Sequence, residues 1–153
     1  MKKRKRVDFL HKRYMGLDVG NKTIGVAVSD LLLLTAQGIT TVKRKGIKTD
    51  LKELEDIMSE YGVEKTIVGL PKNMNNTLGP QGEKVLKFVE KFKEKFPEME
   101  VVMVDERLST VSAERALIGG DVRREKRKDL IDKVAATYIL QSYLDKERGE
   151  RVE

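Results

Sequence analysis

Asp18 is an acidic residue inside a segment that predicts a buried β-hairpin. Residues 14–30 form two runs rich in β-branched and apolar side chains on either side of a Gly-Asn-Lys turn, which is a strong hairpin pattern. Because side chains alternate along a strand, Asp18 shares a face with Gly16, and the small Gly25 and Ala27 are expected to leave open space above it. An ionised carboxylate there is unfavourable unless it is solvated, paired or bound to a metal. Asp18 is therefore either a metal ligand or a turn-proximal acid that accepts backbone hydrogen bonds.

A second acid lies in line with the apolar stripe of the last expected helix. Asp132 begins a series with the spacing i, i+3, i+4, i+7, i+8 and i+11, so one helix face carries it together with the apolar members. The apolar members are Ala135, Ala136, Ile139, Leu140 and Tyr143. An acid in the first turn of a helix also interacts favourably with the helix dipole, which is the alternative for Asp132. Asp129, one turn earlier, is better explained as a cap.

A third acidic position, Asp105-Glu106, directly follows the expected strand 101–104. Sites form at the carboxyl ends of strands in open α/β sheets, so one of these two acids is a candidate to face the same space as Asp18. The alternative is a pair of solvated acids at the end of a strand.

These acids would form a site with oxygen ligands alone. The chain has no cysteine, and its one histidine, His11, lies in the N-terminal segment, so zinc chemistry is not expected. Carboxylate clusters suit Mg²⁺ or Mn²⁺, which can hold a phosphodiester and activate water. Cationic residues of the neighbouring loops would bind a polyanion. They are Lys22, Lys72, Arg107 and the basic run Arg123, Arg124, Lys126, Arg127 and Lys128.

The elements that must position these residues follow from hydrophobic periodicity and turn residues. The expected strands are the hairpin 14–30 and the segments 35–42, 65–70 and 100–104. The expected helices are 49–61, 81–96, 109–119 and 129–146. Thr49 is the expected N-cap of the first helix, and a basic linker precedes the last one. Three consecutive strands imply an antiparallel meander, and the strand–helix–strand units that follow imply parallel pairing with right-handed crossovers. The prediction is an α/β domain with a five-stranded mixed sheet and helices on both faces.

The length and the charge distribution indicate one domain with a basic extension. A chain of 153 residues fits a single domain, which we place at residues 14–148 after an extension of residues 1–13. The net charge of +6 arises entirely within residues 1–14, and this extension either tethers polyanions or is a disordered, solubilising leader. A start at Met15 would remove most of the first strand, so we expect the chain to begin upstream of it. No segment predicts a membrane span or a secretory signal, so a cytoplasmic protein is expected.

Four segments of the chain resemble the sequence blocks of a known family. In chain order they are Asp18-Val-Gly-Asn-Lys-Thr-Ile-Gly25-Val-Ala, Val68-Gly-Leu-Pro-Lys-Asn-Met74, Asp105-Glu-Arg-Leu-Ser-Thr110 and Asp132-Lys-Val-Ala-Ala136. Their order is that of the YqgF/RuvX family, and they cover nearly the whole expected domain. The resemblance implies an RNase H-like fold and a nuclease that either matures the 5′ end of pre-16S rRNA or resolves Holliday junctions.

The resemblance also implies roles for individual residues. The catalytic, metal-binding carboxylates would be Asp18, Glu106 and Asp132. Asp105 would orient its loop, and Arg107 would contact phosphate. Lys72 and Asn73 would line the substrate groove. The chain departs from the family pattern at residues 75–77, where Asn-Asn-Thr stands in place of a common Asp-Gly turn, and this departure leaves the three acids unaffected.

Three alternatives stay open at the level of the sequence. The first is cleavage of branched DNA, which would use the same residues as cleavage of an rRNA precursor. The expected oligomeric state is a monomer or a homodimer. An ATPase domain of the actin or sugar-kinase type carries a similar Asp-x-Gly hairpin, but such proteins need a duplicated domain for which this chain is too short. A non-catalytic scaffold would bind nucleic acid without cleaving it. Aromatic residues make up 5% of the chain, so phosphate contacts rather than base stacking should dominate binding.

Overall fold

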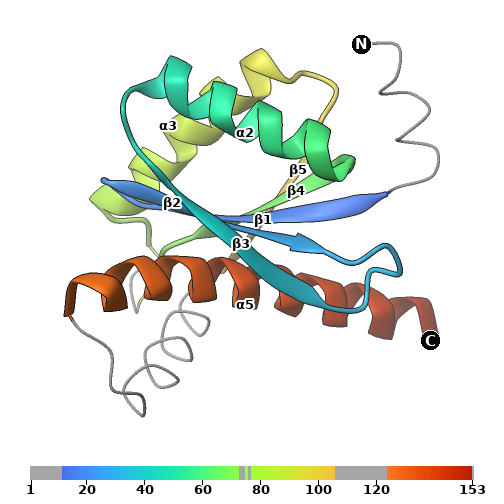
Figure 1. Cartoon of the computed structure of the whole chain (residues 1–153). Coiled ribbons are helices and arrows are strands. Elements are labelled where there is room, and N and C mark those ends of the chain that lie inside the picture. Colours follow the sequence, from blue (N-terminus) through green and yellow to red (C-terminus); the bar gives the residue numbers. More distant parts are fainter. Residues whose placement is uncertain (1–11, 73–74, 76, 106–123, 153) are drawn as a thin grey trace.

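The fold is a five-stranded sheet with helices on both faces (Figure 1). The computed structural model describes residues 12–72, 75, 77–105 and 124–152. In chain order the elements are β1 (Arg13–Val19), β2 (Thr23–Ser29), β3 (Ala36–Lys43), α2 (Ile47–Tyr61), β4 (Val63–Leu70), α3 (Pro80–Lys95), β5 (Glu100–Asp105) and α5 (Arg124–Val152).

The strands have the spatial order β3-β2-β1-β4-β5. β1 pairs antiparallel with β2, and β2 pairs antiparallel with β3, which forms the predicted meander. β4 runs parallel to β1 with Leu17 opposite Val68, and β5 runs parallel to β4 with Leu70 opposite Asp105. The carboxyl ends of β1, β4 and β5 therefore meet at one edge of the sheet, and the predicted mixed topology is confirmed.

Each face of the sheet is covered by its own hydrophobic cluster. α2 and α3 lie on one face, where Met15, Leu17 and Val19 of β1 are buried together with apolar residues of both helices (Figure 1). α5 covers the other face and buries Ile139 and Leu140 there. Because both faces are covered, β2 is buried along its whole length. The alternation predicted for β1 is confirmed.

A row of small residues lets α5 approach the sheet closely. Gly16, Ala27 and Gly38 are register partners on three adjacent strands. A Cβ atom at Gly16 would lie 2.7 Å from the Cβ of Leu140, and a Cβ atom at Gly38 would lie 2.7 Å from the Cγ of Lys133. The helix therefore fills the room that the missing side chains of Gly16 and Gly38 leave, whereas the open space expected above Asp18 itself stays a prediction.

The start of α2 also differs from the sequence prediction. The helix begins at Ile47, directly after Gly46, and not after Thr49. Gly46 has a φ of 133°, which residues with a Cβ atom rarely adopt, so the glycine sets the helix entry. The end is as predicted, because Gly62 is left-handed and its N–H donates to the carbonyl of Met58.

The predicted basic linker before the last helix is partly helical. α5 begins at Arg124, so Arg124 and Lys128 belong to its backbone. Lysine and arginine are favourable helix formers, and a basic run is therefore compatible with a helix. α5 has 29 residues, but neither it nor any other helix in the described part of the chain is apolar enough to cross a membrane.

Candidate functional site

Asp18 lies at the carboxyl end of β1 and is half-buried. Its neighbours Leu17 and Val19 are almost fully buried in the core beneath α2 and α3. Alternation therefore sends Asp18 to the opposite face, the face of Tyr14 and Gly16, which α5 covers. The structure thus confirms the face that the sequence predicts for this carboxylate.

Contacts between β1 and α5 determine which part of the helix passes over Asp18. The ring of Tyr14 lies 6.0 Å from the ring of Tyr143, measured between centroids. Gly16, two residues further along the strand, contacts Ala136, which precedes Tyr143 in the helix. The strand and the helix therefore run in opposite directions, and Asp18 lies beneath the turn of α5 that precedes Ala136.

Position 132 is in that turn of α5. It lies four residues before Ala136, so the two backbone positions are on the same side of the helix. The fold therefore brings backbone positions 18 and 132 towards the same region, although they are far apart in sequence. The side chain of Asp132 is not among those described. The predicted apolar stripe is confirmed from Ala135 onward, where Ala135, Ala136, Ile139 and Leu140 are buried.

β5 ends at the same edge of the sheet as β1. Its last residue, Asp105, is exposed. Val102 and Val104 pack against the cluster beneath α5. Because side chains alternate along a strand, Asp105 lies on the opposite face of the sheet. Asp18 and Asp105 thus share an edge of the sheet but not a face.

The predicted substrate-binding residues are only partly described. Lys22 is exposed in the turn between β1 and β2, and Lys72 is half-buried just after β4. Both lie at the edge where Asp18 lies. Arg124 and Lys128 have backbone positions in α5. The predicted site residues outside the described part of the chain are Asn73, Glu106, Arg107 and Arg123.

The donor atoms at this edge suit a hard cation. Asp18 offers carboxylate oxygens from a half-buried position, and the chain has no cysteine. Among the residues searched, which are the described ones, no group of three acidic, histidine or cysteine side chains could hold a metal ion. A complete metal site here therefore needs carboxylates from positions whose side chains are not described.

A groove lies beside this edge, and the sequence prediction did not include it. It is bounded by the β1–β2 turn, the start of α2 and residues 81–91 of α3, and it holds about 490 Å³. The lining residues, which define the α2–α3 groove, are Val19, Asn21, Arg44, Gly46, Ile47, Asp50, Gln81, Lys84, Lys87, Phe88 and Lys91. The spacing of Lys84, Lys87 and Lys91 is that of one helix face, and this is the signal that could have revealed a basic wall in the sequence.

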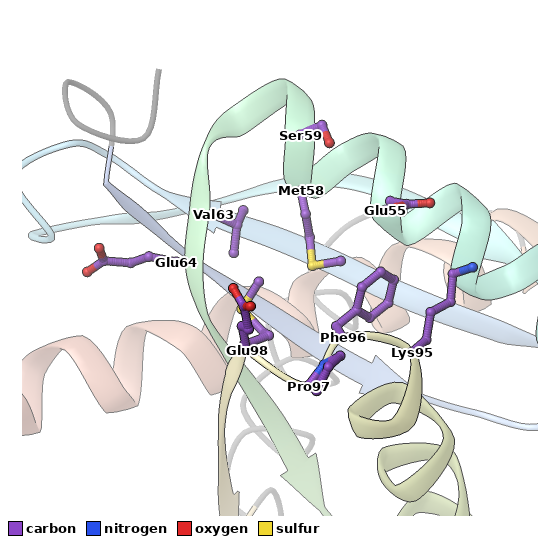
Figure 2. A pocket seen from close by; sticks show the side chains of 10 residues that line it. Glu55, Met58, Ser59, Val63, Glu64, Lys95, Phe96, Pro97 and Glu98 are labelled. Atoms are coloured by element: carbon purple, nitrogen blue, oxygen red, sulfur yellow. The ribbon is translucent and has the colours of Figure 1, made fainter. Parts of the chain in front are cut away.

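Another pocket of about 490 Å³ lies at the opposite edge of the sheet (Figure 2). Its apolar wall includes Met58, Phe96 and Pro97, from the carboxyl ends of α2 and α3 (Figure 2). Its acidic lining residues are Glu55, Glu64 and Glu98. The pocket lies at the amino end of β4, away from Asp18, and its acidic residues would repel a polyanion.

Sequence comparisons connect the chain to nucleases. A family model described as "RuvX: Holliday junction resolvase" matches residues 12–146. A protein of Clostridium tetani is 59% identical over 133 residues, which cover 87% of this chain and 96% of that protein. A protein of Clostridioides difficile is 61% identical over 136 residues, which cover 89% and 96%. Both carry the name "Putative pre-16S rRNA nuclease".

Comparison of structures identifies the fold. T. thermophilus RuvC in complex with a Holliday junction substrate has a TM-score of 0.54 at 18% identity, covering 91% of this chain and 97% of that chain. The fowlpox virus Holliday junction resolvase has a TM-score of 0.53 at 17% identity, covering 88% and 99%. The predicted RNase H-like fold is confirmed.

Proposed function

Since the chain belongs to the RuvX family of Holliday junction resolvases, we propose that it is a divalent-metal-dependent nuclease that hydrolyses phosphodiester bonds in structured nucleic acid. The observation that carries this proposal is the half-buried Asp18 at the carboxyl edge of the sheet, beneath the turn of α5 that holds position 132.

Three carboxylates are proposed to hold the cation and carry catalysis: Asp18, Glu106 and Asp132. The register of α5 on β1 supports Asp132, because its backbone position lies in the turn above Asp18. Glu106 is proposed in preference to Asp105 because Asp105, the last residue of β5, lies on the face opposite Val102 and Val104 and therefore away from α5.

The proposed cation is Mg²⁺ or Mn²⁺, because the donors are carboxylate oxygens. When bound, such an ion polarises the phosphodiester and favours ionisation of a water molecule. Lys22 and Lys72 lie at the same edge and would bind substrate phosphates near Asp18. The other residues proposed to bind substrate are Asn73, Arg107, Arg123, Arg124 and Lys128.

The proposed substrate is the 5′ end of pre-16S rRNA, in keeping with the name of the relatives at about 60% identity. The alternative substrate is a branched DNA junction, which the description of the family model favours. A junction has two symmetric cleavage positions, so a resolvase would act as a homodimer. Parallel cleavage of a 5′-extended rRNA precursor and a four-way DNA junction decides between them, and cleavage of the junction alone would reject the rRNA assignment.

Replacement of Asp18 by asparagine tests the catalytic assignment. Asp18→Asn removes a charge but little volume, and we expect cleavage to fall by about 100-fold or more, as when one charge-stabilising group is lost from an active site. Binding of the substrate in the absence of metal should be retained. Asp56→Asn is the matched control, because Asp56 is exposed on α2 and its one ion pair within the described part of the chain is with the surface residue Lys52 at 3.3 Å.

Thermal unfolding provides a readout that does not depend on activity. Mn²⁺ should raise the Tm of the wild type and of Asp56→Asn, because a ligand that binds only the folded state stabilises it. The same titration should leave the Tm of Asp18→Asn nearly unchanged. An equal rise in Tm for Asp18→Asn would show that Asp18 does not hold the cation. Full cleavage activity in this variant would reject the proposed mechanism.

A further inference from the structure

We propose that the α2–α3 groove binds the phosphodiester backbone of the substrate beyond the cleavage position. The inference rests on the proposed nuclease function and extends it to a second contact surface. The groove lies on the face opposite Asp18, around the tip of the β1–β2 hairpin. It would therefore hold a part of the nucleic acid that is not being cleaved.

One wall of the groove is a row of lysines on α3. Lys84, Lys87 and Lys91 are exposed and share one helix face. Among the described residues, neither Lys84 nor Lys87 forms an ion pair, whereas Lys91 lies 3.9 Å from Glu94. Lys84 donates a hydrogen bond of 3.3 Å to the neutral side chain of Asn21. The charges of this wall are thus largely available to an anion.

The opposite wall is built around a neutralised acid. Asp50 is the one acidic residue of the lining, and it is fully buried. Its carboxylate accepts hydrogen bonds from Arg44 Nε at 3.1 Å and from the backbone N–H of Lys45 at 2.9 Å. The guanidinium of Arg44 also lies 5.5 Å from the ring centroid of Phe88 on α3. Since Asp50 is paired inside the protein, the surface of the groove presents positive charge.

Arg44 also connects the groove to the hairpin that carries Asp18. Its Nη1 donates to the carbonyl of Gly20 at 3.0 Å, and its backbone N–H donates to the carbonyl of Lys22 at 2.8 Å. These bonds hold the hairpin tip against the start of α2. Val19 lines the groove, while Asp18, its neighbour in sequence, lies on the other face. A nucleic-acid strand that crosses the hairpin tip past Lys22 can therefore reach both the groove and the face on which Asp18 lies.

The chemistry of the groove favours backbone contacts over base contacts. Phe88, the one aromatic residue of the lining, is almost fully buried, so the groove offers no aromatic platform to a base. Exposed lysines bind phosphates and carry no sequence information. The groove should therefore contribute affinity for RNA and DNA alike, without reading a sequence.

The test compares two double variants that change the charge of α3 equally. Lys84→Gln with Lys87→Gln removes charge from the groove, and Lys93→Gln with Lys95→Gln removes it from exposed positions of the same helix outside the groove. Binding is measured by fluorescence anisotropy in EDTA with two probes, an RNA duplex with a single-stranded 5′ extension and a four-way DNA junction. The potassium chloride concentration is varied from about 50 to 200 mM, over which phosphate contacts weaken strongly.

We expect the groove variant to bind both probes several-fold more weakly. The slope of log Kd against log salt should fall by about 1.5, because each lost phosphate contact removes about 0.7–0.9. The control variant should keep an affinity and slope close to the wild type. Equal effects of the two variants on both probes, or no effect of either, would overturn the inference.

Cleavage assays on the same proteins separate this inference from the proposed function. A wild type that binds through the groove but cleaves neither probe with Mg²⁺ or Mn²⁺ would support the groove and reject the nuclease. A wild type that cleaves, with a groove variant that binds like the control, would reject the groove alone.

Discussion

Gly16 is a residue at which the sheet and α5 approach each other closely. The backbone carbonyl of Ala136 and the Cβ of Leu140 occupy the space where a side chain of residue 16 would stand. This contact sets the height of the helix above β1, two residues before Asp18. A site that joins Asp18 to the helix therefore depends on a residue without a side chain.

We expect Gly16→Ala to destabilise the fold by about 1–3 kcal/mol, the usual range for overpacking a filled core. The new Cβ would lie 2.7 Å from the Cβ of Leu140 and 2.9 Å from the carbonyl oxygen of Ala136, so the helix must shift. The urea midpoint of unfolding should fall. The cleavage rate should also fall by a larger factor than the fraction of folded protein does. Gly149→Ala is the control, since nothing lies within 4 Å of a Cβ atom there. It should be neutral or stabilising by up to about 1 kcal/mol. An unchanged midpoint for Gly16→Ala would mean that the close approach does not hold in solution.

β4 and the carboxyl half of α5 are joined by one lysine. Lys65 Nζ donates to the hydroxyl oxygen of Tyr143 at 2.9 Å and to Glu147 Oε2 at 3.3 Å. The same ammonium lies 4.7 Å from the ring centroid of Tyr14 and 5.1 Å from that of Tyr143. This cluster holds α5 against the sheet at the far end from Asp18, so it supports the register of the helix along β1.

Both charges of this pair are stabilised by the fold. Burial lowers the pKa of Lys65, but hydrogen bonds with Tyr143 and Glu147 raise it by more, so the pKa lies above its usual value. Burial raises the pKa of Glu147, but the hydrogen bond with Lys65 contributes to an overall shift below the usual value. The stabilisation from Glu147 is therefore present above about pH 4.3 and is lost as the pH falls through its folded pKa. The stabilisation from Lys65 is present below about pH 10.4 and is lost as the pH rises through the folded pKa of this lysine.

Lys65→Met should lower the free energy of unfolding at pH 7 by about 1–3 kcal/mol, between the values for exposed and buried pairs. The difference from the wild type should be nearly constant between about pH 5 and 10 and should shrink below about pH 4.3, as the pH falls through the lowered folded pKa of Glu147. Urea unfolding of both proteins across this pH range measures the difference in free energy of unfolding. Lys52→Met, which breaks only exposed pairs on α2, should change stability by less than about 0.5 kcal/mol. A difference that stays as large as that at pH 7, down to the lowest pH at which the protein is still folded, would contradict the electrostatic explanation.

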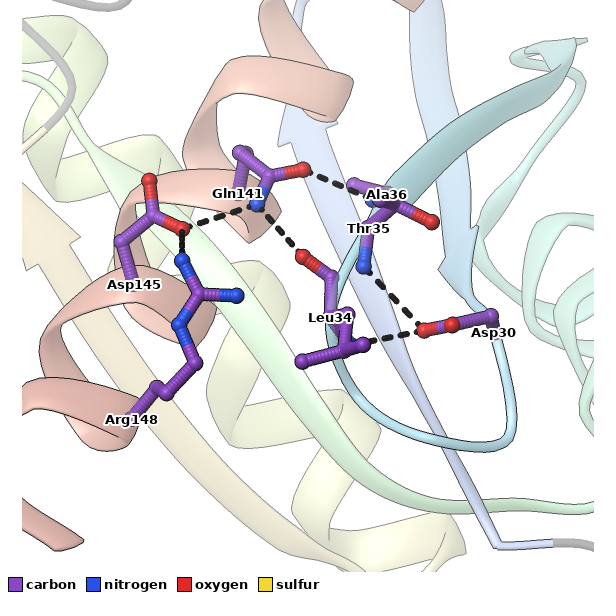
Figure 3. Close-up of polar contacts among 7 residues, drawn as sticks. All are labelled: Asp30, Leu34, Thr35, Ala36, Gln141, Asp145 and Arg148. Carbon is purple, nitrogen blue, oxygen red and sulfur yellow. Dashed lines mark hydrogen bonds and ion pairs between the residues drawn. The ribbon is translucent and has the colours of Figure 1, made fainter. Parts of the chain in front are cut away.

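The loop between β2 and β3 is fastened to α5 by polar side chains (Figure 3). Asp30 Oδ1 accepts hydrogen bonds from the N–H groups of Leu34 at 2.7 Å and Thr35 at 3.1 Å. Burial raises the pKa of Asp30, but these N–H groups lower it by more, so it lies below its usual value. Gln141 of α5 accepts from the N–H of Ala36 and donates to the carbonyl of Leu34 (Figure 3). The flank of α5 that faces β3 is thus held by amide contacts, as its other flank is held by Lys65.

The molecule as a whole presents different chemistry at the two edges of its sheet. The carboxyl edge of β1 carries Asp18, Lys22 and the basic α2–α3 groove. The opposite edge carries the acidic, partly apolar pocket of Figure 2. A polyanion is therefore attracted to the edge at which the proposed site lies.

Residues 2–11 should influence association more than folding. This segment holds five basic residues and one acid, and the excess positive charge of the chain lies within residues 1–14. Deletion of residues 2–11 should slow association with labelled RNA at low salt and reduce the salt dependence of that rate, because long-range attraction is weakened. Stopped-flow fluorescence measures the rate. The urea midpoint should match that of the full chain, and a clear loss of stability would show that the segment belongs to the folded domain.

Local patterns in the sequence were sufficient to predict the five strands, their mixed pairing, the helices α2, α3 and α5, and the face on which Asp18 lies, while the predicted helix 109–119 lies outside the described residues. Alternation and helical spacing are properties of neighbouring residues, and the hairpin turn and Gly62 act over a few positions. The same patterns were less reliable at the ends of helices, because Gly46 and the basic residues from Arg124 onward suit more than one backbone conformation.

Only the tertiary structure decided which part of α5 passes over Asp18 and that the lysines of α3 line the same groove as Arg44. Gly16 and Ala136 are 120 positions apart, and their contact depends on how closely a helix can pack on a row of residues with little or no side chain. The sequence shows small residues at these positions but not what fills the space above them. The sequence and the family resemblance therefore predict which acids form the site and what chemistry they would carry. Packing between distant elements decided how backbone positions 18 and 132 are brought towards the same region, and it created the basic groove beside them.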